Sequence, residues 1–218
     1  MTIRAFIFDL DGVITDTEEY HYQSWKRVAD EEGLPFNRKD NEALRGVSRR
    51  ESLNRLLKGK PVTEAQAQDY MKRKNDYFMT YLNSFSSDNR APGLTEFLDS
   101  AYDLRLRLGV ASASRNVRIV LERLQLTSYF PVVADALTIA NGKPAPDPFV
   151  WVAGGLQVRM HEVVVFEDAQ AGVDAARRAG CHTVGIGRSQ QVEHADLRLL
   201  DGFEGVTLAD ILAAFEKA

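Results

Sequence analysis

Short runs of apolar residues recur along the chain and alternate with helical patterns. The first run covers residues 5–10 and is interrupted only by Asp9, which is typical of a strand buried on both faces of a sheet. Similar runs cover residues 108–111, 132–134, 163–166 and 183–186. Helical patterns lie between them, at residues 117–124 and 169–179 among others. This alternation predicts an α/β fold with a doubly wound parallel sheet.

The alternation stops between residues 15 and 89, where the pattern is helical throughout. Helices are predicted at residues 20–32, 48–57 and 64–82, with glycines and prolines between them. The segment holds 9 of the chain's 20 aromatic residues, and its 13 basic and 13 acidic residues cancel. We expect a core domain of residues 1–14 and 90–218, split by an inserted α-helical cap domain of residues 15–89. The insert is either a helical layer fused to the core or a cap that moves over the strand ends, and its polar flanks favour the second interpretation.

Composition narrows the class of protein. With 218 residues, 44% of them hydrophobic and 27% charged, the chain has the composition of a globular protein. The net charge of -4 argues against a nucleic-acid partner, because binding to a phosphate backbone needs clustered positive charge. A single cysteine, Cys181, excludes an internal disulfide and a multi-cysteine zinc site. The single cysteine fits a reducing compartment, and neither an export pattern nor an apolar run of membrane length is present, so we expect a cytoplasmic protein with no membrane partner. We also expect a monomer.

Polar residues stand next to the predicted strands, at the ends where an open parallel sheet binds ligands. Because these ends meet at one edge of the sheet, we expect the polar side chains to lie close together. The groups are Asp9 with Asp11, the triplet Ser112, Ala113 and Ser114, Lys143 within the string GKPAPDP, and Glu167 with Asp168.

The chemistry of these residues points to phosphoryl transfer. A carboxylate at Asp9 can attack phosphorus and form an acyl phosphate. Asp11 is the natural general acid and base, because the negative charge of its neighbours favours its protonated form. Ser112, the backbone of Ala113 and Lys143 can donate hydrogen bonds to the phosphoryl oxygens. We therefore expect Asp9 to be the nucleophile.

Two anions approach one another in such a reaction, so the site needs a hard divalent cation bound by oxygen. The available ligands are Asp9, the backbone carbonyl of Asp11, Glu167 and Asp168, and Mg²⁺ is favoured because it pairs carboxylates with substrate phosphate. Each group has a plainer interpretation: the aspartates could form a solvated turn, Glu167 could stand behind the metal ligands, and the acidic pair could cap the next helix. The joint occurrence of all the groups favours one Mg²⁺ per chain.

The order of these groups resembles the haloacid dehalogenase superfamily of phosphoryl-transfer enzymes, whose hallmark is the string DxDG at the end of the first strand. Four longer strings resemble the β-phosphoglucomutase family: DLDGVITDT followed by EYH, then LRGVSRRESL, KRKND and SASRN. The resemblance implies a Rossmann-like core with a helical cap. It also implies interconversion of β-D-glucose 1-phosphate and D-glucose 6-phosphate through an aspartyl phosphate, with glucose 1,6-bisphosphate as intermediate and activator.

The resemblance assigns the two phosphate-binding ends of the site. Arg49 matches the arginine that binds the distal phosphate, and a guanidinium suits bidentate contact with phosphate. Arg115 and Asn116 line the same end. Arg45 and Arg115 both stand where lysine is expected, which keeps the charge but alters reach and geometry. The transfer end takes the triplet Ser112, Ala113 and Ser114 together with Lys143.

Residues of the cap complete the implied site. Thr17 and His21 would hold Asp11 out of line until the cap closes over substrate. The sugar contacts implied by the resemblance are Trp25 and Leu44 as apolar walls, Gly46 and Val47 through their backbone groups, and Arg45.

Several alternatives stay open. His21 forms a stripe with Trp25 and Val28, so its role could be packing. A second stripe is interpreted as cap core, and two further polar residues stay unassigned. The stripe is Tyr77, Phe78 and Tyr81, and the unassigned residues are Ser52 and Asn75. The alternative functions are a sugar-phosphate phosphatase on the same scaffold and a catalytically silent binding protein, and the preferred sugar and anomer are left open.

Overall fold

The computed structural model describes residues 2–187 and 192–216. Its centre is a six-stranded sheet in the order β3-β2-β1-β4-β5-β6, and every neighbouring pair is parallel. The strands are β1 (Ala5–Phe8), β2 (Arg107–Ala111), β3 (Val132–Ala134), β4 (Val163–Glu167), β5 (His182–Ile186) and β6 (Leu197–Leu199). The predicted doubly wound α/β fold is confirmed. The strand β6, which the apolar pattern does not indicate, extends the sheet beyond β5.

The central strand β1 is buried on both faces, as its apolar run predicts. Phe6 and Phe8 point into one apolar cluster, whereas Ala5 and Ile7 point into another on the opposite face. The ring of Phe8 stacks on that of Phe166 at a centroid distance of 4.7 Å. The alternation of large aromatic and smaller aliphatic residues therefore decides which face of the sheet receives the bulkier core.

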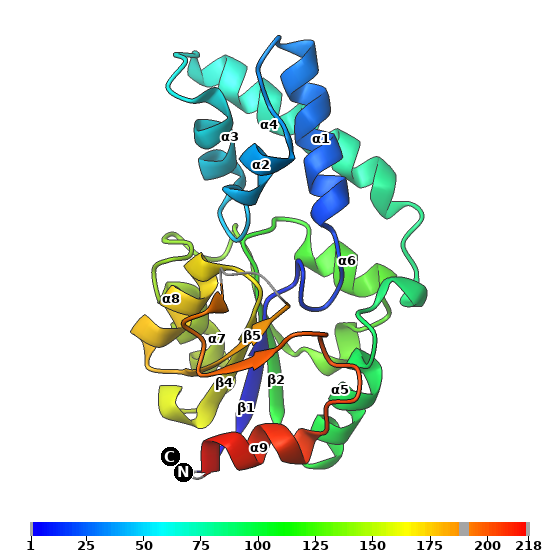
Figure 1. Cartoon of the computed structure of the whole chain (residues 1–218), viewed down its shortest axis with the longest axis vertical. Helices are drawn as coiled ribbons and strands as arrows, with labels where there is room; N and C mark the ends of the chain where they lie inside the picture. The colour runs from blue at the N-terminus through cyan, green and yellow to red at the C-terminus, as the bar shows by residue number, and fades with distance from the viewer. Residues whose placement is uncertain (1, 188–191, 217–218) are drawn as a thin grey trace.

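Helices cover the two faces of the sheet (Figure 1). Residues of α5, α6 and α9 belong to the cluster that contains Phe6 and Phe8, and residues of α7 and α8 belong to the cluster on the opposite face. The bounds are α5 (Leu94–Asp103), α6 (Val117–Arg123), α7 (Asp147–Gly155), α8 (Gln170–Ala179) and α9 (Leu208–Glu216), with short 3-10 helices at Thr127–Tyr129 and Met160–Glu162. This arrangement leaves the carboxyl ends of the strands open for a site.

The four helices between β1 and α5 stand above those strand ends (Figure 1). They are α1 (Glu18–Glu31), α2 (Arg38–Glu42), α3 (Arg49–Leu57) and α4 (Glu64–Leu82), followed by a 3-10 helix at Ser87–Asn89. The chain crosses between the core and the insert twice, and the two crossings are hydrogen-bonded to each other. Thr15 Oγ1 donates to Asn89 O at 2.6 Å, and Ala91 N donates to Ile14 O at 2.9 Å. These crossings lie near the domain limits that the sequence predicts at residues 15 and 89.

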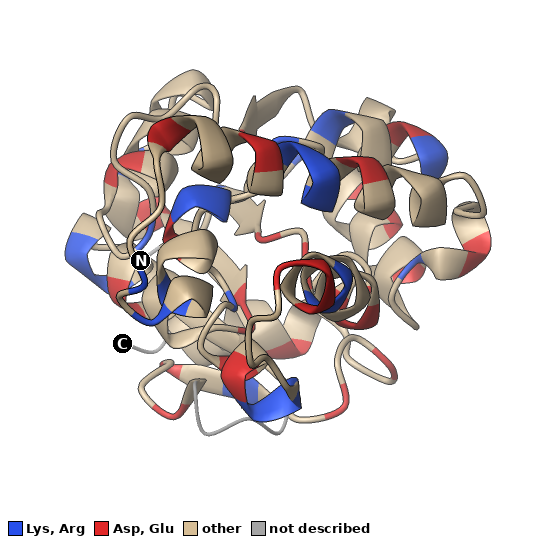
Figure 2. Ribbon diagram, turned by 90° about the horizontal axis from the view of Figure 1, so that it is seen from above, with Lys and Arg blue, Asp and Glu red and all other residues tan. Residues whose placement is uncertain are grey.

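The helical insert has an apolar cluster of its own, which includes Trp25, Leu53 and Met71. Its contact with the core is also partly apolar, since Phe78 and Leu82 of α4 belong to the main core cluster. Basic and acidic residues alternate over the helices when the molecule is seen from above (Figure 2). No described helix is long and apolar enough to cross a membrane.

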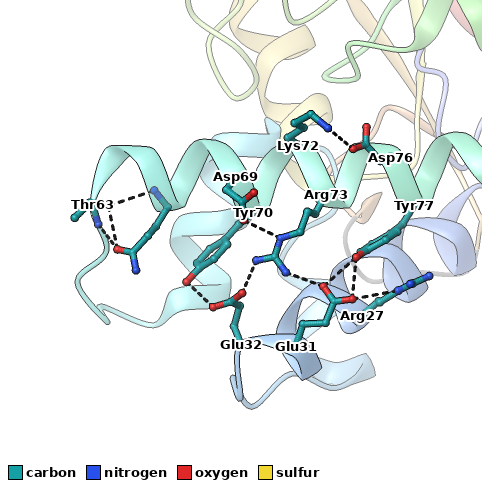
Figure 3. A network of polar contacts seen from close by, with 11 residues as sticks. Arg27, Glu31, Glu32, Thr63, Asp69, Tyr70, Lys72, Arg73, Asp76 and Tyr77 are labelled. Carbon is teal, nitrogen blue, oxygen red and sulfur yellow. Dashed lines mark hydrogen bonds and ion pairs between the residues drawn. The ribbon is translucent and has the colours of Figure 1, made fainter.

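A network of ion pairs joins α1 to α4 on the outer side of the insert (Figure 3). Arg73 lies at its centre: it donates to Glu31 at 2.7 Å, to Asp69 at 2.8 Å and to Glu32. The hydroxyl of Tyr77 donates to Glu31 at 2.8 Å. Because Glu31 and Glu32 form the end of α1, the single guanidinium of Arg73 fixes that end against the middle of α4.

We predict that Arg73→Ala lowers the free energy of unfolding by about 1 to 2 kcal/mol, because it leaves three carboxylates without their shared cation. The adjacent variant Lys72→Ala removes only an exposed pair with Asp76 and should leave the free energy of unfolding nearly unchanged. The side chain of Lys72 is 75% exposed, against 25% for Arg73. Urea unfolding followed by circular dichroism measures both, and equal losses would contradict a special role for Arg73.

Candidate active site

The strand ends and the helical insert enclose a cavity of about 100 Å³, lined from both sides. Most of the residues predicted for the site meet here. The lining residues named by the sequence are Asp9, Asp11, His21, Trp25, Leu44, Arg45, Gly46, Val47, Arg49, Ala113, Ser114, Arg115 and Asp168. Ser112 and Lys143 line an adjoining hollow that shares Arg49 and Arg115 with this cavity. The sheet and the insert thus contribute opposite walls of one space.

Three buried carboxylates gather at the ends of β1 and β4. Each of Asp9, Glu167 and Asp168 places an oxygen within 4.8 Å of those of the other two. Burial raises the pKa of Glu167 to about 8 and that of Asp168 to about 7, and it raises the pKa of Asp9 as well. Three hard oxygen donors with unfavourable mutual repulsion fit a divalent cation such as Mg²⁺. The backbone carbonyl of Asp11 stays the predicted fourth ligand.

Two side-chain cations balance part of this negative charge. Lys143 Nζ donates to Asp9 Oδ1 at 2.6 Å and to Glu167 Oε1. Burial opposes the charge of Lys143, but the two carboxylates outweigh burial and raise its pKa above the usual range. Arg45 of the insert donates to Asp168 Oδ2 at 2.5 Å. The expected sugar-binding Arg45 therefore lies on a carboxylate of the core in this structure, where it joins the insert to the sheet.

Asp11 points away from this cluster, toward the start of the insert. Its Oδ1 accepts a hydrogen bond from Thr17 Oγ1 and lies 3.4 Å from His21 Nε2, while Lys74 Nζ donates to His21 Nδ1 at 2.6 Å. Burial alone would raise the pKa of Asp11, but His21 and Thr17 outweigh it and hold that pKa below its usual value. Burial lowers the pKa of His21 and brings that of Lys74 to about 7.

These contacts assign the hydrogen bonds of His21. A neutral imidazole donates from Nε2 toward Asp11 and accepts at Nδ1 from Lys74, so one proton arrangement satisfies both contacts. The same ring stacks on Phe78 at a centroid distance of 4.3 Å. His21 therefore both packs within the insert and contacts Asp11, while its role in holding Asp11 until the cap closes stays a prediction.

The opposite end of the cavity is cationic. Arg49 donates to Asn75 Oδ1 at 2.8 Å, and Asn116 Nδ2 donates to the same oxygen at 3.0 Å. Burial and the nearby charge of Arg115 lower the pKa of Arg49 to about 10. Within the described residues, Arg115 makes no hydrogen bond or ion pair, so two guanidinium groups share this end without a carboxylate between them. Such an end favours an anionic ligand group.

Some site residues were missed by the sequence analysis. Lys74, Ser52 and Asn41 line the cavity, and Asn75 orients Arg49. The signal for Lys74 is its place on the buried side of α4, where Met71 and Phe78 are its neighbours. A lysine on the apolar stripe of an amphipathic helix is expensive to bury and therefore suggests a functional partner. Asn75 and Asn41 carry no such signal.

Comparisons with known proteins agree with this geometry. The sequence pattern described as haloacid dehalogenase-like hydrolase matches residues 6–186. A β-phosphoglucomutase of Bacillus subtilis (strain 168) is 39% identical over 89% of this chain and 88% of its own. A phosphorylated carbohydrates phosphatase of Thermotoga maritima is 32% identical over 84% of each chain. The crystal structure of a Clostridium difficile β-phosphoglucomutase superposes with a TM-score of 0.95 at 34% identity, over 99% of this chain and 98% of that one.

We predict that Gly172→Ala weakens Mg²⁺ binding by about tenfold or more, because groups that position metal ligands have effects of this size. A Cβ at Gly172 would lie 1.9 Å from Glu167 Oε1, so the carboxylate would have to leave its place beside Asp9. Titration calorimetry with MgCl₂ measures the affinity directly.

The matched control is Gly154→Ala in α7, where an added Cβ meets nothing within 4 Å. It should bind Mg²⁺ like the unchanged protein and be slightly more stable, because alanine favours helix over glycine. Circular dichroism checks that both variants fold. An unchanged Mg²⁺ affinity in a folded Gly172→Ala protein would show that Glu167 does not hold the metal.

Proposed function

Because this chain belongs to the haloacid dehalogenase-like hydrolase family, we propose that it is a phosphomutase that interconverts β-D-glucose 1-phosphate and D-glucose 6-phosphate. The observation that carries the proposal is that one site has cationic side chains for a phosphate at each of its two ends, with Lys143 beside the carboxylate of Asp9 at one end and Arg49 with Arg115 at the other. A bisphosphate has two dianionic groups, so it can use both ends at once. The similarity to a β-phosphoglucomutase supports the choice of sugar.

In the proposed first half-reaction, Asp9 begins as an aspartyl phosphate. The 6-hydroxyl of β-glucose 1-phosphate attacks its phosphorus, the bond from phosphorus to the Asp9 oxygen breaks, and the hydroxyl proton passes to the carboxylate of Asp11. The products are glucose 1,6-bisphosphate and free Asp9. Lys143 Nζ, 2.6 Å from Asp9 Oδ1, is placed to donate to the oxygens on which negative charge accumulates.

In the second half-reaction the bisphosphate turns around within the closed cavity. Asp9 then attacks the phosphorus at position 1, the bond to the sugar oxygen breaks, and Asp11 returns its proton to that oxygen. Glucose 6-phosphate leaves, and the aspartyl phosphate is regenerated. Arg49 would hold whichever phosphate is not reacting, as the bidentate geometry of a guanidinium allows.

A bound Mg²⁺ at Asp9, Glu167 and Asp168 would supply positive charge against the repulsion between the phosphate and the attacking carboxylate. The protein's own residues control the proton. Thr17 and His21 keep the pKa of Asp11 low and its carboxylate turned toward the insert. We infer that Asp11 reaches the reacting oxygen only when the insert closes on substrate. Before closure, Asp11 is not in place to accept a proton from water, so the aspartyl phosphate is protected from hydrolysis.

A sugar-phosphate phosphatase is the second candidate. The observation in its favour is the similarity to the carbohydrate phosphatase of Thermotoga maritima, which also covers most of this chain. Both functions use the same nucleophile and the same proton carrier. They differ in whether water or a sugar hydroxyl accepts the phosphoryl group from Asp9.

The products decide between the two functions. With β-glucose 1-phosphate, Mg²⁺ and a trace of glucose 1,6-bisphosphate, we expect glucose 6-phosphate to form with little free phosphate. The measurement follows glucose 6-phosphate and inorganic phosphate in the same sample, with the α-anomer in parallel. Release of one phosphate per sugar consumed would establish the phosphatase in place of the mutase.

A second prediction tests the distal end of the site. Arg49→Ala should lower mutase turnover by about 100-fold or more, because a bidentate guanidinium makes two charge-assisted contacts to a phosphate and each is worth about 1.5 to 3 kcal/mol. Hydrolysis of a small aryl phosphate, which has no second phosphate, should fall far less. Steady-state kinetics on both substrates gives the ratio. Equal losses on the two substrates would show that Arg49 acts at the transfer end or on folding.

A further inference from the structure

Asn41 belongs to the short helix α2, and Figure 1 shows this helix in the part of the insert that faces the sheet. Its backbone is fully used: Asn41 N donates to Asn37 O at 3.0 Å, and Leu44 N donates to Asn41 O at 2.8 Å. Asn37 caps the helix, since its side chain accepts from the backbone N–H groups of Lys39 and Asp40. The backbone position of Asn41 is therefore fixed by the turn that carries it.

Asn41 is a buried residue, and its side chain makes no hydrogen bond to any residue that the structure describes. The residue is 5% exposed and lines the cavity between the insert and the sheet, so its remaining exposed surface faces ligand space. Within the described part of the chain, the side chain of every other buried polar residue that lines this cavity makes a hydrogen bond. These pairs are Asp9 with Lys143, Ser52 with the backbone of Ser48, Lys74 with His21, and Asp168 with Arg45.

The chemistry of an amide indicates what would pair with it. Asn41 offers an acceptor oxygen and two donor hydrogens, and it carries no charge. The phosphate groups of a sugar bisphosphate are served by lysine and arginine at the two ends of the site. A neutral group that both donates and accepts matches a sugar hydroxyl, or two adjacent hydroxyls that share the amide. Trp25, which lines the same cavity, is 3% exposed and gives the wall an apolar part.

We infer that Asn41 is a specificity-determining residue that binds ring hydroxyls of the sugar between its two phosphate-binding ends. The inference rests on the proposed function as far as the ligand is a sugar phosphate, but it holds for mutase and phosphatase alike. Buried polar groups that lose a ligand hydroxyl stay unpaired, and this penalty lets a site reject an analogue that lacks the hydroxyl.

The kinetic test uses β-glucose 1-phosphate and its 2-, 3- and 4-deoxy analogues. Glucose 6-phosphate (or its deoxy form) and inorganic phosphate are summed, so the readout works for either function. We expect the unchanged protein to disfavour one analogue in kcat/KM by about 10- to 100-fold, and Asn41→Leu to lose most of that preference at the same ring position only. A uniform loss over all substrates, or an unchanged preference, would overturn the inference.

A stability measurement gives an independent readout. If the amide has no partner within the free protein, Asn41→Leu should leave the urea midpoint unchanged or raise it, because the exchange removes no protein hydrogen bond and adds an apolar group of similar size. A clear drop in the midpoint would mean that the amide has a structural partner, which also overturns the inference. The matched control is Asn54→Leu, the same exchange at an exposed position of α3, which should leave the sugar preference and turnover unchanged.

Failure of the proposed mutase and failure of the inference about Asn41 give different results. Release of free phosphate in place of glucose 6-phosphate rules out the mutase, but the inference about Asn41 still holds if Asn41→Leu loses the preference at one ring position. A working mutase whose preference is the same in Asn41→Leu removes the inference alone.

Discussion

The burial of three carboxylates at one edge of the sheet is the constraint on which the rest of the site depends. Asp9, Glu167 and Asp168 come from two neighbouring parallel strands, and their mutual repulsion must be balanced by cations. Lys143 supplies one from the core, and Arg45 supplies another from the insert, 123 residues away from Asp168 in sequence. The charge balance of the site is therefore linked to the position of the insert. A divalent metal that joins the carboxylates would alter the need for Arg45.

The opposite end of the cavity shows the complementary condition. Arg49 and Arg115 lie close enough to lower the pKa of Arg49, and Asn75 and Asn116 offer neutral partners in place of a carboxylate. An anion bound between the two guanidinium groups would offset their repulsion. One end thus gathers acids that need a cation, and the other gathers cations that need an anion. A phosphate ester that arrives with a divalent metal relieves both at once.

Sequence patterns were sufficient to predict the sheet, because a strand buried on both faces appears as a continuous apolar run. They were also sufficient to bring together the residues at the strand ends, because the carboxyl ends of parallel strands lie at one edge of the sheet. They were insufficient for the insert side of the site. Lys74 and His21 are 53 residues apart, and Asn75 and Asn116 are 41 residues apart, so their meeting depends on how helices pack. Lys74 could have been found as the charged member of a buried helical stripe. Asn41 could not, because an asparagine after a capping box is equally common on a surface.

A mutase and a phosphatase on this scaffold differ in whether Asp11 becomes available for proton transfer before the substrate is bound. The residues that contact Asp11 are placed to control this. Thr17 lies where the chain enters the insert and His21 lies on the first turn of α1, so both partners that hold Asp11 belong to the insert rather than to the sheet. Lys74 fixes His21 from α4, and the Arg73 network fixes α4 to α1 on the outer side. Contacts across the insert therefore connect the position of His21, and with it that of Asp11, to the packing of α1 against α4. In the proposed mechanism, a more loosely joined insert would free Asp11 without substrate, and water would then compete for the aspartyl phosphate.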